Sequence, residues 1–153
     1  MNFDHPAKGR PGRGPEVGGA PTAGPRRVDG LLRILLIAHG VITLAAALVL
    51  AVLPAAIPAT VGIELGADAF LLSYFLAAAE LAIALLSLGA TRLTDPAAVG
   101  LIVGVFVVFH LATAALELVY LLFAPVTVVL IANIVVRVVV AALFVFAWRR
   151  WRR

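Results

Sequence analysis

Apolar residues fill four long blocks of the chain between residues 31 and 148, and polar side chains interrupt them only at wide intervals. We expect membrane-spanning helices at about 31–53, 69–90, 97–123 and 126–148. A helix rises about 1.5 Å per residue and the hydrocarbon core of a bilayer is about 30 Å thick, so about 20 apolar residues span it with their backbone hydrogen bonds satisfied. The pattern therefore predicts an all-α protein, an antiparallel bundle of four transmembrane helices.

Prolines and short polar segments separate these blocks. Pro54 ends the first span, because proline lacks the amide hydrogen that a helix interior needs. Segment 55–68 is amphiphilic, and we expect it to lie along the membrane interface. Asp95 before Pro96 predicts the start of the third helix. Pro125 leaves so short a connection between the last two spans that these helices must be antiparallel neighbours.

The first 28 residues are rich in proline and glycine and contain almost no large apolar side chain. Such a segment cannot bury enough surface to offset the entropy lost on ordering. We therefore expect a disordered basic tail over 1–28, followed by one transmembrane domain over 29–153. The tail lacks the apolar stretch of a signal peptide, and the first apolar stretch after it is longer than such a stretch usually is.

The composition agrees with a membrane protein, because 63% of the residues are hydrophobic, 13% are charged and the mean hydropathy is +1.12. Cysteine is absent, which excludes disulfides, thiolate metal sites and a cysteine nucleophile. The isoelectric point near 10.7 does not make nucleic acid an expected partner, because the basic residues flank the apolar blocks.

Ten of the twelve basic residues lie in the tail, in the turn between the second and third spans, and at the C-terminus, and an eleventh, Arg33, lies at the start of the first span. Cytoplasmic retention of positive charge and attraction to anionic lipid headgroups explain this placement. We therefore expect both termini to be cytoplasmic, which agrees with four crossings. The eleven residues are Lys8, Arg10, Arg13, Arg26, Arg27, Arg33, Arg92, Arg149, Arg150, Arg152 and Arg153.

Five ionisable side chains deep in the spans, together with one asparagine, carry the candidate chemistry. An ionisable group near the bilayer centre costs about 2.5 to 3.5 kcal/mol on insertion scales, so such groups usually face the bundle interior or a watery cavity. Helical spacing aligns these side chains into one polar stripe per helix. We therefore predict a buried polar cluster made by His39, Glu80, His110, Glu117, Asn133 and Arg137.

Counting residues inward from the span ends predicts which of these groups share a depth. Arg137, Glu80 and His110 fall near the midplane, and Glu117 and Asn133 fall further toward the outer side. We expect Arg137 and Glu80 to form the central ion pair, with His110 beside it and Glu117 alternating as a partner of Arg137.

His39 is expected in the inner half of the membrane, at a tight helix contact. Gly40 and Thr43 lie on nearby faces of the same helix and suit close packing. A neutral imidazole that donates one hydrogen bond fits this position.

Two interpretations of the polar cluster stay open. It can be structural, fixing which helix faces point inward, or it can be a proton or ion pathway, since carboxylates and histidines form such relays. The histidines and glutamates show no HxxxH or ExxH spacing, so no metal site is expected. No catalytic or cofactor motif is recognised.

Gly100 and Gly104 form a GxxxG pattern in the third span, which allows two helix backbones to approach closely. We expect packing within the chain at this seam, and a homodimer contact is the alternative.

Several motifs together give a resemblance. The pattern of His39–Gly40, LPAAIP at 53–58, Glu80, DPAA at 95–98 and FHLATAALE at 109–117 resembles small four-helix bacterial membrane proteins of the DoxX-like kind. The resemblance implies a four-helix bundle in the bacterial cytoplasmic membrane. Some such proteins are described as accessory subunits of membrane redox systems. The size is also similar to the small multidrug resistance exporters, but their first span carries a carboxylate where this chain has His39.

Two classes of function remain. The favoured one is a non-enzymatic membrane component, either a partner subunit or a bundle that holds a small apolar ligand, with the bilayer, another membrane protein or a second copy as partners. The alternative is a proton-coupled small-molecule carrier that uses Glu80, Glu117 and His110. A carrier usually has broken helices or repeated halves, and the sequence shows neither. A membrane enzyme ranks third, because no nucleophile accompanies the glutamates.

Overall fold

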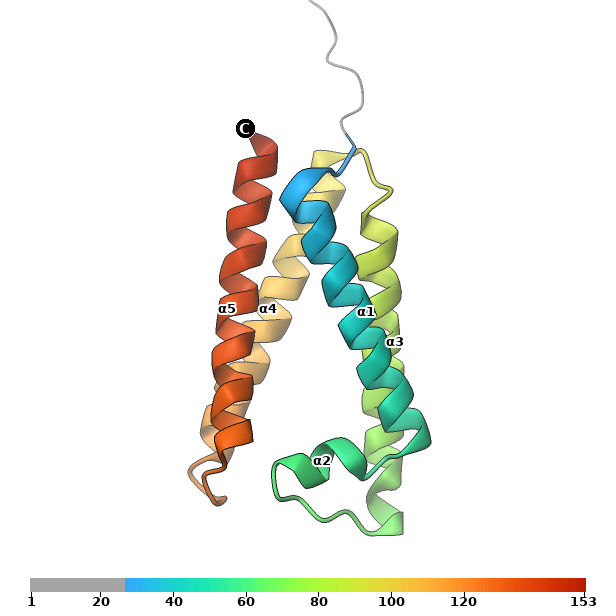
Figure 1. Cartoon of the computed structure of the whole chain (residues 1–153), viewed down its shortest axis with the longest axis vertical. Coiled ribbons are helices and arrows are strands. Elements are labelled where there is room, and N and C mark those ends of the chain that lie inside the picture. Colours follow the sequence, from blue (N-terminus) through green and yellow to red (C-terminus); the bar gives the residue numbers. More distant parts are fainter. Residues whose placement is uncertain (1–26) are drawn as a thin grey trace, which may run out of the picture.

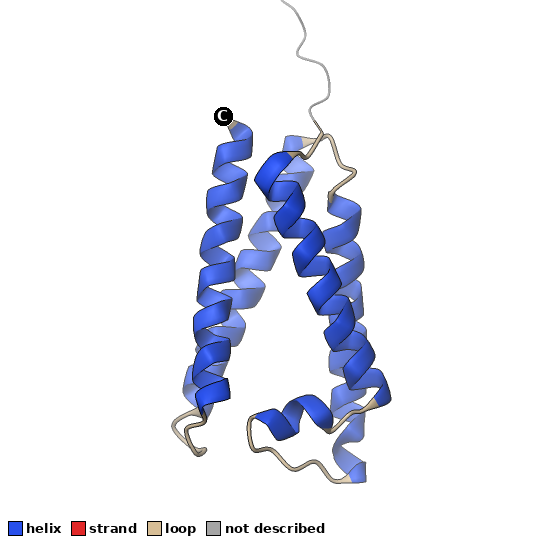
Figure 2. Cartoon of the chain, in the orientation of Figure 1, coloured by secondary structure: helices blue, strands red, loops and turns tan. Residues whose placement is uncertain are grey.

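The computed structural model describes residues 27–153, and all regular structure in this range is helical (Figures 1 and 2). Four helical segments are long and apolar enough to cross a membrane. They are α1, α3 together with the short turn η1 before it, α4 and α5. The prediction of an all-α four-helix bundle is confirmed, and the chain is a multi-pass integral membrane protein. The elements in chain order are α1 (Gly30–Val52), α2 (Ala56–Thr60), η1 (Ala67–Ala69), α3 (Phe70–Ala90), α4 (Pro96–Tyr120) and α5 (Val128–Arg152).

The first two predicted spans match α1 and α3 to within one residue at each end. The third ends earlier than predicted, at Tyr120, because the chain turns over residues 121–124. The fourth begins at Val128 and runs past Trp148 to Arg152. Arginines in the last turn of a helix interact favourably with its negative end, so the basic C-terminus prolongs α5.

The residues predicted to begin and end helices do so. The carboxylate of Asp95 accepts hydrogen bonds from the amides of Ala97 (3.0 Å) and Ala98 (3.3 Å), and Pro96 occupies the first helical position of α4. α1 ends before Pro54 as expected. Thr127 caps α5 by accepting a hydrogen bond from the amide of Leu130, at 3.2 Å.

The long helices form two antiparallel pairs. α1 packs mainly on α3, and α4 packs mainly on α5, while α3 and α4 contact each other little. Figure 1 shows that the pairs meet at the end where the chain terminates, which we call the closed end, and diverge toward the other, the open end. The short helix α2 lies across the open end. The predicted antiparallel packing of the last two spans is confirmed.

The main apolar core lies where the pairs meet. Leu36 of α1, Phe106 of α4 and Phe144 of α5 are completely buried there. A smaller cluster of Ala114, Leu130 and Ile134 joins α4 to α5 further along. The closed end is therefore filled by side chains of both pairs, and this packing holds the two pairs together.

Residues 1–26 of the predicted tail lie outside the described residues. Its last two residues are described. Val28 is 2% exposed, and the backbone carbonyl of the exposed Arg27 accepts a hydrogen bond from the indole nitrogen of Trp151 at 3.3 Å. The aromatic C-terminal turn of α5 therefore holds this segment against the bundle.

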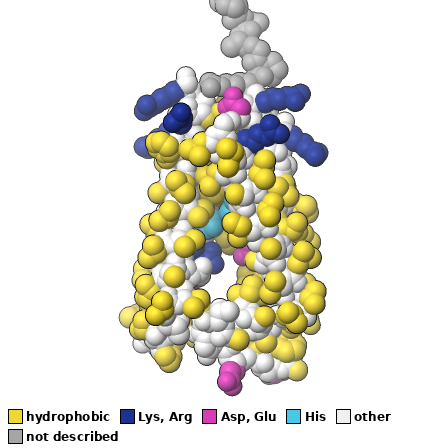
Figure 3. Space-filling view, viewed as in Figure 1, with side chains coloured by type: hydrophobic (Ala, Val, Ile, Leu, Met, Phe, Trp, Pro, Cys, Tyr) yellow, Lys and Arg dark blue, Asp and Glu magenta, His cyan; other side chains and the backbone are white. Residues whose placement is uncertain are grey.

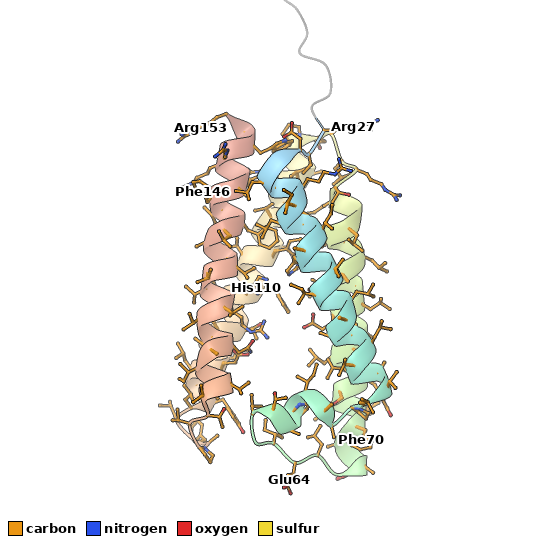
Figure 4. The ribbon with its side chains drawn as sticks, viewed as in Figure 1. Arg27, Glu64, Phe70, His110, Phe146 and Arg153 are labelled. Atoms are coloured by element: carbon orange, nitrogen blue, oxygen red, sulfur yellow. The ribbon has the colours of Figure 1, made fainter. Side chains whose placement is uncertain are left out.

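Charged side chains divide between the two ends of the bundle. Figure 3 shows basic groups gathered around an acidic group at the closed end and an acidic group at the open end, with apolar side chains covering most of the surface between them. Figure 4 places Arg27 and Arg153 at the closed end and Glu64 at the open end. The described parts of both chain ends therefore lie on the same side of the bundle.

Candidate functional site: the polar cluster between the helix pairs

The predicted polar residues lie on the inward faces of their helices. On α4, His110 and Glu117 continue the line of the buried residues Val103, Phe106 and Ala114. The other helices repeat this arrangement. On α5, Asn133 and Arg137 lie beside the buried residues Leu130, Ile134, Ala141 and Phe144. On α3, Glu80 lies between the buried residues Ser73, Ala77, Ala84 and Ser87. The prediction of one inward polar stripe on each of these helices is therefore confirmed.

Two histidines make the central contact between the pairs. The Nε2 atoms of His39 on α1 and His110 on α4 lie 3.1 Å apart, and both side chains are buried. The other ring nitrogen of His39, Nδ1, lies 3.1 Å from the hydroxyl oxygen of Ser87 on α3. That hydroxyl donates to the carbonyl of Leu36, at 2.9 Å. These four groups form one continuous hydrogen-bonded chain, which we call the histidine chain.

The histidine chain has a fixed direction when both rings are neutral. Ser87 has a single hydroxyl proton and donates it to Leu36, so its oxygen can only accept from Nδ1–H of His39. A neutral His39 then has a bare Nε2, which accepts from Nε2–H of His110. His110 is left with a bare Nδ1, and this buried atom makes no hydrogen bond within the described residues.

Packing around His39 agrees with the predicted tight contact. Its ring centroid lies 4.8 Å from that of Phe106 and 5.2 Å from that of Phe144. Gly40 next to it lies so close to Leu88 of α3 that an added Cβ would be 2.7 Å from Cγ of that side chain. The one hydrogen bond that His39 was expected to donate goes to Ser87, and His39 in addition accepts a hydrogen bond from His110.

The predicted central ion pair between Arg137 and Glu80 is wrong, and Glu117, which was predicted as the alternating partner of Arg137, forms the pair instead. Arg137 pairs with Glu117, not with Glu80, through a 3.0 Å contact between Nε and Oε1. Asn133 also donates to this oxygen, at 2.6 Å. All three residues belong to α4 and α5, which pack side by side, whereas α3 belongs to the other pair. We call Glu117, Asn133 and Arg137 the ion-pair cluster.

Glu80 stands apart from the ion-pair cluster. Its side chain is half-buried on α3, and its carboxylate makes no hydrogen bond or ion pair within residues 27–153. Glu80 and Arg137 therefore lie on the inward stripes of opposite helix pairs without direct contact.

An opening separates the two pairs below the histidine contact. Figure 3 shows the molecule hollowed between them, with histidine, basic and acidic groups visible inside the apolar surface. Figure 4 places His110 on α4, between the pairs and on the closed side of this opening. Arg137 and Glu117 lie on inward stripes yet keep 20% and 17% of their side chains exposed. The opening accounts for this exposure.

The described residues provide no metal site of the usual kind, because no group of three or more histidine and carboxylate side chains between residues 27 and 153 converges. One buried acceptor of the ion-pair cluster, Oε2 of Glu117, makes no hydrogen bond in that range.

The two glycines of the GxxxG pattern have different surroundings. A Cβ added to Gly100 would lie 2.9 Å from Cζ2 of Trp148, so α5 packs closely there as expected. Gly104 has no neighbour within 4 Å of such an atom. Both line an open apolar groove of about 570 Å³ on the outer side of α4, together with Leu101, Val105, Val108 and Phe109. Packing within the chain therefore involves only the first glycine.

Ser87 is the functional residue that the prediction of the site left out. It was recognisable, because it follows Glu80 by seven residues and so lies on the same helix face. Its contact with His39 depends on how α1 and α3 pack, which the spacing within one helix does not reveal.

No family model, curated protein or solved structure matches this chain. The resemblance to DoxX-like proteins accordingly stays a prediction.

Proposed function

We propose that this chain is a non-enzymatic membrane component that holds a small apolar or amphiphilic ligand between its two helix pairs. One observation carries the proposal: inward-facing polar side chains stay partly exposed because the pairs diverge beside them. A bundle that needed these groups only for packing would bury them, since exposing ionisable groups to lipid costs free energy. Ligand sites in helical bundles lie between helices in this way.

The hydrogen bonds of the Ser87 hydroxyl, which lies beside His39, support a non-enzymatic role. Ser87 donates its proton to the carbonyl of Leu36, and the neighbouring histidine nitrogen is a donor toward it. A serine nucleophile needs the reverse arrangement, in which a histidine accepts the hydroxyl proton. Ser87 is therefore built as a structural link between α1 and α3.

The setting that we propose is the bacterial cytoplasmic membrane, with both termini in the cytoplasm. The orientation is supported by the basic residues at the closed end and the acidic residues Glu64 and Asp68 on the connection between α2 and α3. The bacterial setting is supported by the DoxX-like resemblance alone.

A role as an accessory subunit is compatible with ligand binding. The groove along Gly100 and Gly104 offers a shallow apolar surface on which a helix of another membrane protein, or of a second copy, could pack closely. We place the partner on this face because the opposite face of α4 packs within the bundle.

The ligand can be sought in protein purified from its native membrane. We expect mass spectrometry of an organic extract to find one class of molecule enriched over bulk lipid in the unaltered chain. Glu80→Trp fills the opening and should remove most of it, whereas Leu81→Trp, on the exposed face of α3, should retain it. An extract that matches bulk lipid for the unaltered chain would contradict the proposal.

A proton-coupled carrier is the second candidate, and one observation favours it. The histidine chain crosses between the pairs, and such chains can pass protons. In this chain the path ends at the backbone carbonyl of Leu36, which cannot relay a proton further. Substrate-dependent proton flux into liposomes that Glu80→Gln abolishes would favour the carrier over the component.

A further inference from the structure

The opening has unused hydrogen-bonding groups on both of its sides. Arg137 uses Nε for Glu117, and its two Nη nitrogens make no hydrogen bond within residues 27–153. Neither nitrogen is completely buried, so both keep accessible surface. Across the opening, the carboxylate of Glu80 is likewise accessible and unbonded. One side of the opening thus offers donors and the other offers acceptors.

The route into the opening limits what can reach these groups. Leu36, Phe106 and Phe144 fill the closed end, and α2 lies across the open end. The sides of the opening face the hydrocarbon of the bilayer, since all four long helical segments are apolar. A guest therefore enters from the lipid, and a charged headgroup would lose its hydration on this route at a cost of several kcal/mol. The polar part of the guest should be neutral.

A hydroxyl group matches the hydrogen-bonding chemistry of both sides of the opening. It carries one donor and two acceptor positions, so it can donate to Glu80 while accepting from an Nη of Arg137. An ether or a ketone can bond only to Arg137, and an alkane can bond to neither. Bonds to charged groups are the stronger kind, which makes the difference measurable.

We propose that the opening between the helix pairs binds a neutral lipophilic alcohol, whose hydroxyl bridges Glu80 and Arg137 and whose apolar chain extends between the diverging pairs. This inference depends on the proposed function, because it names the chemistry of the ligand that the opening holds. The pairing of Arg137 with Glu117 holds the guanidinium in place for this contact.

The test uses the full chain in lipid nanodiscs and a long-chain alcohol that carries a photoactivatable diazirine in its tail. We expect labelling to map to α3 and α5 beside the opening. Excess hexadecanol should compete for labelling about tenfold better than hexadecane or hexadecyl methyl ether, the difference expected for one or two net hydrogen bonds. Hexadecylamine tests a cationic head.

Two substitutions separate polar recognition from the opening itself. Glu80→Leu should remove the preference for the alcohol over the ether, and Glu64→Leu, which removes an acid on the exposed connection, should leave it unchanged. Should Glu80→Leu not fold, the comparison of competitors on the unaltered chain still tests whether the opening prefers the alcohol.

The outcomes distinguish this inference from the function on which it depends. Equal competition by alcohol, ether and alkane would contradict the preference for an alcohol but would agree with ligand binding in the opening. Stronger competition by the amine would have the same meaning. Absence of specific labelling beside the opening with the alcohol would overturn the alcohol. Loss of specific labelling with a diazirine-tagged alkane as well would overturn both.

Discussion

The Nε2 atoms of His39 and His110 lie 3.1 Å apart, and this contact joins α1 to α4 where the two helix pairs begin to diverge. Among the described residues, the side-chain hydrogen bonds that link the two pairs are this one and the bond from Trp151 to the carbonyl of Arg27. The histidine contact therefore ties the pairs together beside the opening, and the other bond ties them at the closed end.

The direction of the histidine chain predicts the tautomer of each ring. We expect His39 to carry its proton on Nδ1 and His110 to carry its proton on Nε2, because Ser87 has already donated its hydroxyl proton. Multiple-bond ¹⁵N–¹H NMR of the histidine-labelled protein in nanodiscs identifies the protonated nitrogen of each ring. A proton on Nε2 of His39 in the neutral state would contradict the chain as described.

Substitution of Ser87 tests how much this chain stabilises the fold. Ser87→Ala leaves Nδ1–H of the buried His39 without an acceptor, which typically costs about 1 to 3 kcal/mol of the free energy of unfolding. Ser73→Ala is the matched control, because Ser73 is also buried on α3 but bonds only to the carbonyl of Pro54. Denaturant unfolding in mild detergent measures both, and equal losses would argue against a special role for the histidine contact.

The ion-pair cluster should behave as a unit. Glu117→Leu leaves the guanidinium of Arg137 without its counter-charge, and breaking a buried pair in this way costs about 3 to 5 kcal/mol. About a fifth of each side chain is exposed, so we expect the lower part of that range or less. The double variant Glu117→Leu/Arg137→Leu should be more stable than Glu117→Leu alone. Additive losses in a double-mutant cycle would show that the two residues act independently.

The GxxxG pattern gives a prediction with its control in the same helix. Gly100→Ala places a Cβ against the ring of Trp148 and should destabilise the α4–α5 pair by about 1 to 3 kcal/mol, the usual cost of overpacking. Gly104→Ala meets no neighbour among the described residues and should not lower the free energy of unfolding of the monomer. Weaker self-association of Gly104→Ala in detergent would instead locate a contact between copies at this face.

The spans and caps were predictable because they depend on local sequence. The length of the apolar blocks predicted α1 and α3, and Asp95 before Pro96 predicted the start of α4. Counting residues inward placed Arg137 at the depth of Glu80 and placed Glu117 further out, so depth favoured the ion pair that does not form. The partner of Arg137 was not readable, because depth does not tell which helices are neighbours. Glu80 has a suitable depth, but α3 packs on α1, away from α5.

The sidedness of the bundle is testable because the chain contains no cysteine, so single cysteines can be introduced without removing any. Thr94→Cys and Arg153→Cys lie at the closed end, and Ala67→Cys lies on the exposed connection before α3. In intact bacterial cells, a membrane-impermeant maleimide should label Ala67→Cys only, because basic residues keep the closed end in the cytoplasm. The reverse pattern would overturn the orientation but keep four crossings. Different labelling of Thr94→Cys and Arg153→Cys would overturn the crossings themselves, since both positions lie at the same end of the bundle.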